Sequence, residues 1–169
     1  TEGLLHPDIL YIIKKCGEVQ AMDYWFTTNG TLLSEGIARA MVESGVTKLH
    51  VSLDAAKPET YKKIRGGNLE IVEKNVKRFL EIRDSLGSEL PMLRVTMGEQ
   101  EDNRDEVDQF VEKWTGIADM VDVQKLTEYS ILENEELDRE SYQHTFFDCY
   151  YPFYQLSITY DGRLWPCPC

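Results

Sequence analysis

The sequence lacks the segments that insert a protein into a membrane or direct it to secretion. No stretch approaches the roughly 18 uninterrupted apolar residues that a membrane helix needs. The chain begins with Thr1 and shows neither the basic stretch nor the apolar core of a secretory signal. Its 169 residues, with 42% hydrophobic and 28% charged residues, suffice for a domain with a real core. We therefore expect a cytoplasmic globular protein with no membrane partner.

Positive charge is also scarce. The chain has 30 acidic and 18 basic residues, a net charge of −12, and no local basic stripe. A phosphate backbone would be repelled by such a surface, so nucleic acid is not an expected partner. The G-x-G-x-x-G fingerprint and the P-loop are absent as well, which removes the usual phosphate cradles of nucleotide-binding sheets.

Only four cysteines occur, and three of them lie in the last twenty-one residues. Without a secretory signal the expected compartment is reducing, where clustered cysteines favour a metal over a disulfide. The fourth, Cys16, falls on the apolar stripe of a predicted helix, so we expect a buried cysteine without a chemical role.

Helix and strand patterns alternate along the first three quarters of the chain. Such alternation predicts parallel strands joined by right-handed helical crossovers, half of a (β/α)₈ barrel, with an open doubly wound sheet as the alternative. Asn103 and Glu106 resemble a capping box at the start of the last helix. The predicted strands cover 21–30, 47–55, 91–97 and 118–126, and the predicted helices cover 6–17, 34–45, 68–87 and 103–114.

Polar residues gather where the predicted strands end. In barrels and open sheets the carboxyl ends of the strands meet at one edge, where active sites are built. Thr, Asn, Ser and Asp are also common turn and cap residues, so the pattern predicts the location of a site and not its chemistry. These residues are Thr27, Thr28, Asn29, Ser52, Asp54, Thr96, Gln124 and Lys125.

Several segments, in order, resemble the radical S-adenosylmethionine (SAM) enzymes. "TEGLLHPDI" resembles their G-G-E-P loop, and "TTNGTLL" and "VSLDAAKPETYKKIRGG" resemble strand ends with the loops that follow. "C…DGRLWPC" resembles the entry to the SPASM extension, which holds auxiliary iron–sulfur clusters. The resemblance covers the whole chain. It implies a partial (β/α) barrel over residues 1–140 and, over 141–169, the start of a SPASM-like β-hairpin extension.

The resemblance also implies residues that bind the cofactor. Glu2 matches the glutamate that lies by the SAM amino group, and Ser52 matches the residue that contacts SAM near its carboxylate and ribose. Arg65 offers fixed bidentate donors to a carboxylate. The cofactor-binding positions implied in this way are Glu2, Thr28, Asn29, Ser52, Asp54 and Arg65.

The spacing of the last cysteines matches the opening of the SPASM signature. Twelve residues separate Cys149 from Gly162, and four separate Gly162 from Cys167. Alternating apolar residues and the Asp161-Gly162 pair predict a hairpin between these cysteines, which brings them towards one centre. Iron–sulfur clusters are commonly held by four thiolates. We expect Cys149, Cys167 and Cys169 to be the first ligands of an auxiliary [4Fe–4S] cluster.

In the family that the chain resembles, a [4Fe–4S] cluster held by a Cys-x3-Cys-x2-Cys loop binds SAM. One electron cleaves SAM to a 5′-deoxyadenosyl radical, which abstracts a substrate hydrogen. The resemblance therefore implies an oxidoreductase or maturase with a peptide or small-molecule substrate and an electron donor such as flavodoxin or ferredoxin. No Cys-x3-Cys-x2-Cys occurs in the sequence. We expect the chain to correspond to part of such an enzyme and to be inactive alone.

Two other interpretations stay open. One is a non-catalytic α/β domain with a structural zinc at the three last cysteines, with His144 as a fourth ligand. The other is a binding or structural domain whose thiols hold no metal. Neither His6 nor His50 has a partner at metal or catalytic spacing, so the sequence assigns them no catalytic role.

Overall fold

The computed structural model describes residues 2–19, 23–125, 153, 156–159 and 161–165. The chain divides into two units, Thr1–Lys125 and Leu126–Cys169, which are described separately below. The domain boundary predicted at residue 140 lies outside the described residues.

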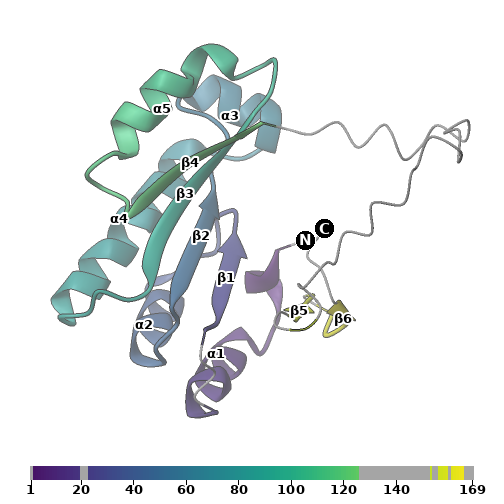
Figure 1. Cartoon of the computed structure of the whole chain (residues 1–169), viewed down its shortest axis with the longest axis vertical. Coiled ribbons are helices and arrows are strands. Elements are labelled where there is room, and N and C mark those ends of the chain that lie inside the picture. The colour runs from purple at the N-terminus through teal and green to yellow at the C-terminus, as the bar shows by residue number, and fades with distance from the viewer. Residues whose placement is uncertain (1, 20–22, 126–152, 154–155, 160, 166–169) are drawn as a thin grey trace, which may run out of the picture. The chain divides into compact units, whose positions relative to one another are not determined.

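A four-stranded parallel sheet forms the centre of the first unit. The strands are β1 (Trp25–Thr28), β2 (Lys48–Ser52), β3 (Met92–Glu99) and β4 (Met120–Lys125), and each pairs with its neighbour in sequence order (Figure 1). The alternation of patterns thus predicted the four strands and their parallel pairing. The helices are α1 (Ile9–Glu18), α2 (Glu35–Glu43), α3 (Pro58–Arg65), α4 (Leu69–Ser85) and α5 (Val107–Trp114), with short 3-10 turns η1 (Gly3–Leu5) and η2 (Arg104–Glu106).

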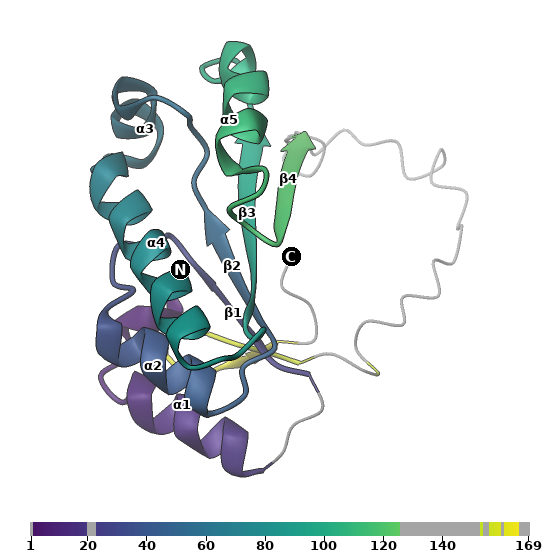
Figure 2. The ribbon, with the colours of Figure 1, turned by 90° about the vertical axis from the view of Figure 1, so that its left-hand side faces the viewer.

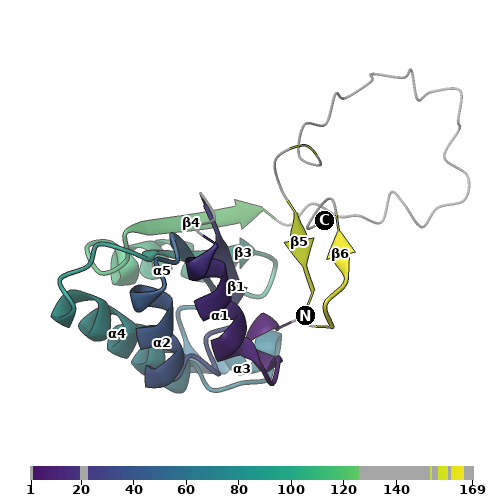
Figure 3. The ribbon, with the colours of Figure 1, turned by 90° about the horizontal axis from the view of Figure 1, so that it is seen from below.

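All five helices lie on one face of the sheet (Figures 2 and 3). A doubly wound sheet carries helices on both faces, whereas a barrel keeps them on the outside only. Sequential strand order with one-sided helices therefore confirms the partial (β/α) barrel. Among the described residues, no helix combines the length and the apolar character needed to cross a membrane.

The two faces of the sheet differ in chemistry. On β2 and β3 the side chains that face the helices are buried and apolar, as with Leu49, Val51 and Leu93, each 0% exposed. Every second residue points the other way. We call this second surface the helix-free face; its side chains are Trp25, Thr27, Lys48, His50, Ser52, Met92, Arg94, Thr96, Met120, Asp122 and Gln124.

Local signals explain most helix ends. The hydroxyl of Ser34 accepts from the N–H of Ile37 at the start of α2, and Asn68 accepts from Glu70 N–H at the start of α4 (2.9 Å). Helix α3 is not among the predicted elements, although Pro58 in its first turn and Gly66, with φ +72°, just after it are ordinary start and stop signals. Cys16 of α1 is half-buried, less enclosed than predicted.

The predicted hairpin is present in the second unit. Strands β5 (Ser157–Ile158) and β6 (Leu164–Trp165) pair antiparallel, and the N–H of Gly162 donates to the carbonyl of Thr159 (2.9 Å). Gly162 has φ +79°, which a glycine adopts without strain. The cysteines that it was expected to bring together, Cys149 and Cys167, lie outside the described residues, as does Cys169.

Candidate functional site

Glu2 is held against the carboxyl end of β1. Its Oε2 accepts from the N–H of Asn29 (2.7 Å), and its Oε1 accepts from the N–H of Leu4 at the start of η1 (3.1 Å). The carboxylate thus fixes the loop of residues 2–6 to the strand end. Each oxygen retains a lone pair, because a carboxylate oxygen accepts two hydrogen bonds.

Thr27 and Thr28, the last two residues of β1 before the turn, lie in different surroundings. Thr28 is only 3% exposed, and its hydroxyl accepts from the N–H of Gly30 (3.0 Å). It serves the turn, whereas Thr27 lies on the helix-free face. Gly30 has φ +76°, and a Cβ there would lie 2.7 Å from a methyl group of Val72. The turn can therefore be this tight only with glycine.

Two of the other predicted residues bind each other: Asp54 in the loop after β2 and Arg65 at the end of α3. Asp54 adopts φ +57°, its Oδ1 accepts from the N–H of Gly98 (2.7 Å), and its Oδ2 accepts from Arg65 Nε (2.6 Å). Arg65 is therefore an ion-pair partner within the protein, which is an assignment that the sequence did not make. Ser52 is half-buried on the helix-free face, and no described residue hydrogen-bonds its hydroxyl.

A buried carboxylate, Glu106, joins this loop to the next one. Glu106 is 2% exposed and accepts from the N–H groups of Ala56 (2.9 Å) and Lys57 (3.0 Å) and from the hydroxyl of Thr60. It caps the start of α3, a helix from another part of the chain. Burial alone would raise the pKa of Glu106, but these hydrogen bonds and the charge of Lys57 outweigh it and hold the pKa below its ordinary value.

The capping box predicted from Asn103 and Glu106 is therefore wrong. The side chain of Asn103 makes no cap hydrogen bond at its own helix. It is 0% exposed, and its Nδ2 donates to the carbonyls of Asp54 and Gly98 (2.8 Å each). Both polar residues bond across to neighbouring loops, and spacing along one helix contains no signal for such contacts.

Charged and aromatic side chains occupy the middle of the helix-free face. Arg94 of β3 forms an ion pair with Asp122 of β4, whose Oδ2 also accepts from Gln124 Nε2 (2.7 Å). On β1 and β2 the rings of Trp25 and His50 are stacked, with centroids 6.4 Å apart. The alternation in "KLHVS" and "LRVT" was the signal for this polar row, since each second residue there is polar.

The electrostatics of this row keep His50 neutral and Asp122 ionised. Burial, followed by the nearby cations Arg94 and Lys48, lowers the pKa of His50 below its ordinary value. At pH 7 its imidazole therefore offers one donor and one acceptor. Burial would raise the pKa of Asp122, but the hydrogen bonds from Arg94 and Gln124 hold it below its ordinary value.

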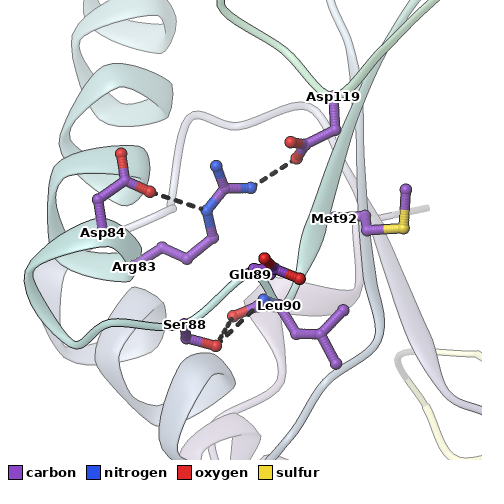
Figure 4. A pocket seen from close by; sticks show the side chains of 7 residues that line it. All are labelled: Arg83, Asp84, Ser88, Glu89, Leu90, Met92 and Asp119. Atoms are coloured by element: carbon purple, nitrogen blue, oxygen red, sulfur yellow. Dashed lines mark hydrogen bonds and ion pairs between the residues drawn. The ribbon is translucent and has the colours of Figure 1, made fainter.

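An open cavity of about 400 Å³ lies at the other end of the sheet (Figure 4). Arg83, at the end of α4, donates from Nη1 to Asp119 Oδ2 (2.5 Å) and to the carbonyl of Pro91 (3.3 Å), and Asp119 also accepts from the N–H of Leu93. Contacts at the amino ends of barrel strands usually serve stability. These bonds tie α4, β3 and β4 together and place the cavity away from the predicted site.

Within the described part of the chain, no three His, Cys, Asp or Glu side chains are grouped so as to hold a metal ion. Burial raises the pKa of the Cys16 thiol, which keeps it protonated and unreactive at pH 7. The predicted metal ligands Cys149, Cys167 and Cys169 lie outside the described residues, so their role stays a prediction.

Comparison with known proteins identifies the family. Residues 1–113 match the family described as "Radical SAM superfamily". The chain belongs to this superfamily. The matched segment contains β1, β2 and β3 with α1–α4 and nearly all of α5, including Glu2, the turn after β1 and the loop after β2, and it ends before β4. The SPASM-like extension predicted for the end of the chain lies beyond this match.

The superfamily relatives that the chain matches include proteins named as GTP 3′,8-cyclases. One from Methanococcus maripaludis, a "probable" cyclase, is 42% identical over 82 residues, 48% of this chain and 27% of that protein. One from Limosilactobacillus fermentum is 42% identical over 73 residues, 42% of this chain and 22% of that protein. These matches thus span about a quarter of each relative's length.

A solved structure shares the fold of this superfamily member. The crystal structure of Streptococcus suis SuiB bound to S-adenosylmethionine has a TM-score of 0.55 and 14% sequence identity. The match covers 99% of this chain and 47% of that one. At this identity the likeness concerns the fold alone.

Proposed function

We propose that this chain forms part of a radical SAM enzyme that cleaves SAM reductively and abstracts a hydrogen atom from a substrate. The observation that carries the proposal is Glu2, a carboxylate fixed at the carboxyl end of β1 inside the segment that matches the superfamily. Barrel enzymes build their sites at this edge. The helix-free face then forms one wall of the reaction cavity.

The side chains at this edge fit the polar groups of SAM. The SAM ammonium group needs an acceptor, which the free lone pairs of Glu2 supply. The SAM carboxylate and ribose hydroxyls need hydroxyl and amide partners, and Ser52, Thr27 and the side chain of Asn29 are such groups at the ends of β1 and β2. Asp54 and Arg65 already bond one another, so we assign them to positioning the loop after β2.

SAM, when bound and reduced by one electron, supplies the radical that takes the substrate hydrogen. The chain's own residues bind and orient. Glu2 holds the ammonium group, Ser52 fixes the opposite end of the amino acid moiety, and the buried core behind β1–β3 keeps water from one side of the cavity. Further ligands for an auxiliary [4Fe–4S] cluster are Cys149, Cys167 and Cys169, and a flavodoxin or ferredoxin is the electron donor.

Two observations bear on the class of substrate, and they favour different classes. The relatives named GTP 3′,8-cyclases favour a guanine nucleotide. The resemblance of the last segment to a SPASM extension favours a peptide or another small molecule. The polar middle of the helix-free face suits either, because it presents both charged and neutral hydrogen-bonding groups.

The test uses the full-length gene product, purified and reconstituted without oxygen. Iron and sulfide content, SAM affinity by equilibrium dialysis, and 5′-deoxyadenosine formation after addition of dithionite are measured. Glu2→Gln is expected to weaken SAM binding about tenfold or more, because an amide binds an ammonium group less strongly than a carboxylate does. The amide oxygen still accepts one backbone hydrogen bond, which limits the effect on the fold.

Glu101→Gln is the matched control, because Glu101 is exposed and no described residue bonds its carboxylate. It should leave SAM affinity unchanged. Absence of iron and sulfide after reconstitution, or equal SAM affinity in the Glu2 variant and the wild-type protein, would contradict the proposal. Zinc without sulfide would favour the structural metal site instead.

A further inference from the structure

One buried polar atom on the helix-free face has no partner. Arg94 Nε is enclosed and makes no hydrogen bond, and it is the sole side-chain atom of this kind among the described residues. The same guanidinium uses Nη2 for Asp122, so its charge is balanced while one donor stays unused. Leaving a buried donor unpaired is unfavourable, so a ligand that accepts a hydrogen bond from it gains binding free energy.

His50 lies beside this donor with unused capacity of its own. Its Cα is the direct partner of Arg94 in the parallel register, which places the two side chains on the same face of strands about 4.8 Å apart. No described residue hydrogen-bonds either ring nitrogen of His50. Because the imidazole is neutral, it presents one acceptor next to the Arg94 donor.

We propose that His50 and Arg94 bind a cis-amide edge of the substrate, that is, a carbonyl and an N–H on the same side of an amide. This inference rests on the proposed function. The substrate carbonyl oxygen accepts from Arg94 Nε, and the N–H on the same side donates to the imidazole of His50. A trans peptide bond points its carbonyl and its N–H in opposite directions and does not fit. The lactam edge of a nucleobase and the carboxamide of Asn or Gln both fit.

Neighbouring side chains favour a planar group at this position. Trp25 is 38% exposed and stacked on His50, and the ammonium group of Lys48 lies 5.7 Å from the centre of the Trp25 ring. The two ring planes differ by only 26°, so they present nearly parallel aromatic faces on which a planar group can stack. Asp122 balances the charge of Arg94, which suits a neutral edge better than an isolated anion.

The test measures probe binding to the full-length protein, saturated with SAM and kept without reductant, by isothermal titration calorimetry. The probes are guanosine, with a lactam edge, and the tripeptide Ala-Gln-Ala, with a carboxamide. Their counterparts, 1-methylguanosine and Ala-Glu-Ala, lack the required N–H. At least one probe is expected to bind about tenfold or more tightly than its counterpart, and which one binds identifies the source of the edge.

Two variants locate that binding. His50→Phe keeps an aromatic ring without nitrogens, and Arg94→Lys keeps the charge without the guanidinium donors. Each should weaken the bound probe about tenfold or more, since one contact of the pair is lost. Met92→Ala, on the same face of β3 but outside the proposed contact, is the control and should leave probe affinity within about twofold.

The proposal is overturned if neither probe binds below about 1 mM, if the methylated or acidic counterpart binds equally well, or if the two variants bind like the wild-type protein. It is also overturned if His50→Phe lowers SAM affinity as much as probe affinity, because the residue would then act on the cofactor site. A wild-type protein that fails to bind SAM contradicts the proposed function instead, so the two failures are distinguishable.

Discussion

The two faces of β2 and β3 are built from the same thirteen residues and yet differ in burial, polarity and charge. On the helix-covered face Leu49, Val51 and Leu93 are 0% exposed, and apolar side chains from α2, α4 and α5 pack on them. One residue further along each strand, His50 and Arg94 are polar and only partly buried. Strands of a parallel sheet that is buried on both faces are nearly continuous in apolar residues. The alternation here means that one face forms the core and the other bounds a polar space.

The comparison predicts opposite sensitivities to truncation for adjacent residues. Leu93→Ala removes a side chain that is 0% exposed and should lower the free energy of unfolding by about 2–5 kcal/mol, since the cavity adds to the lost burial. Met92→Ala truncates the 42% exposed neighbour on the helix-free face and should cost less than about 1 kcal/mol. Urea unfolding of both variants measures the difference. Equal losses would show that another segment buries the helix-free face as deeply.

Glu106→Gln tests how much the buried hydrogen bonds of Glu106 contribute to stability. Glu106→Gln is expected to lower the free energy of unfolding by about 1–3 kcal/mol, because a side-chain amide cannot accept from Ala56, Lys57 and Thr60 together. Asp105→Asn is the control, since Asp105 is 78% exposed and its ion pair, from Oδ2 to Lys57 Nζ, is long at 3.7 Å and screened by solvent. If the control destabilised the protein as much as Glu106→Gln, net charge and not the buried bonds would be the cause.

The same residue gives a pH dependence. The pKa of Glu106 is lower in the folded chain than in the unfolded one, so its contribution to stability is complete above the unfolded pKa. It is lost as the pH falls through the folded pKa, which lies below the ordinary value of a glutamate. Unfolding free energy measured from pH 7 to pH 3 should therefore fall less steeply in Glu106→Gln than in the wild-type chain. Parallel curves would contradict this assignment.

The ion pair on the helix-free face should matter least for stability. Arg94 and Asp122 are 29% and 30% exposed, so solvent screens their attraction. Asp122→Asn is expected to change the free energy of unfolding by less than about 1 kcal/mol. A loss as large as that of Glu106→Gln would show that the pair is a structural link and not part of a ligand surface.

The sequence predicted what depends on local periodicity. Leu69, Val72, Val76 and Phe79 at helical spacing gave α4, and Asp161-Gly162 gave the turn between β5 and β6. Helix α3 was not predicted because its Pro58 and Gly66 signals lie in a polar segment with a single buried residue, Tyr61. In the candidate site, the position of Ser52 at the end of β2 was predicted from the strand pattern, whereas the bond of Glu2 to the N–H of Asn29 was not.

Contacts between separate parts of the chain were not predictable. The pairing of Asp54 with Arg65, the buried position of Thr28 and the bonds of Asn103 and Glu106 to the loop after β2 depend on which loops become neighbours. Spacing within one helix or strand carries no information on this. His50 was overlooked for the same reason, because its neighbour Arg94 lies 44 residues further along the chain and becomes its partner only through the strand register.

The bonds from Asn103 and Glu106 to the loop after β2 have a consequence for protein engineering. Asp54, Ala56 and Lys57 on one side and Gly98, Asn103 and Glu106 on the other form a single hydrogen-bonded unit, although about fifty residues separate the two halves in sequence. A chimera that imports the first loop from a relative without the second would place donors opposite foreign side chains. Transplanted specificity at this edge therefore requires both loops to be exchanged together.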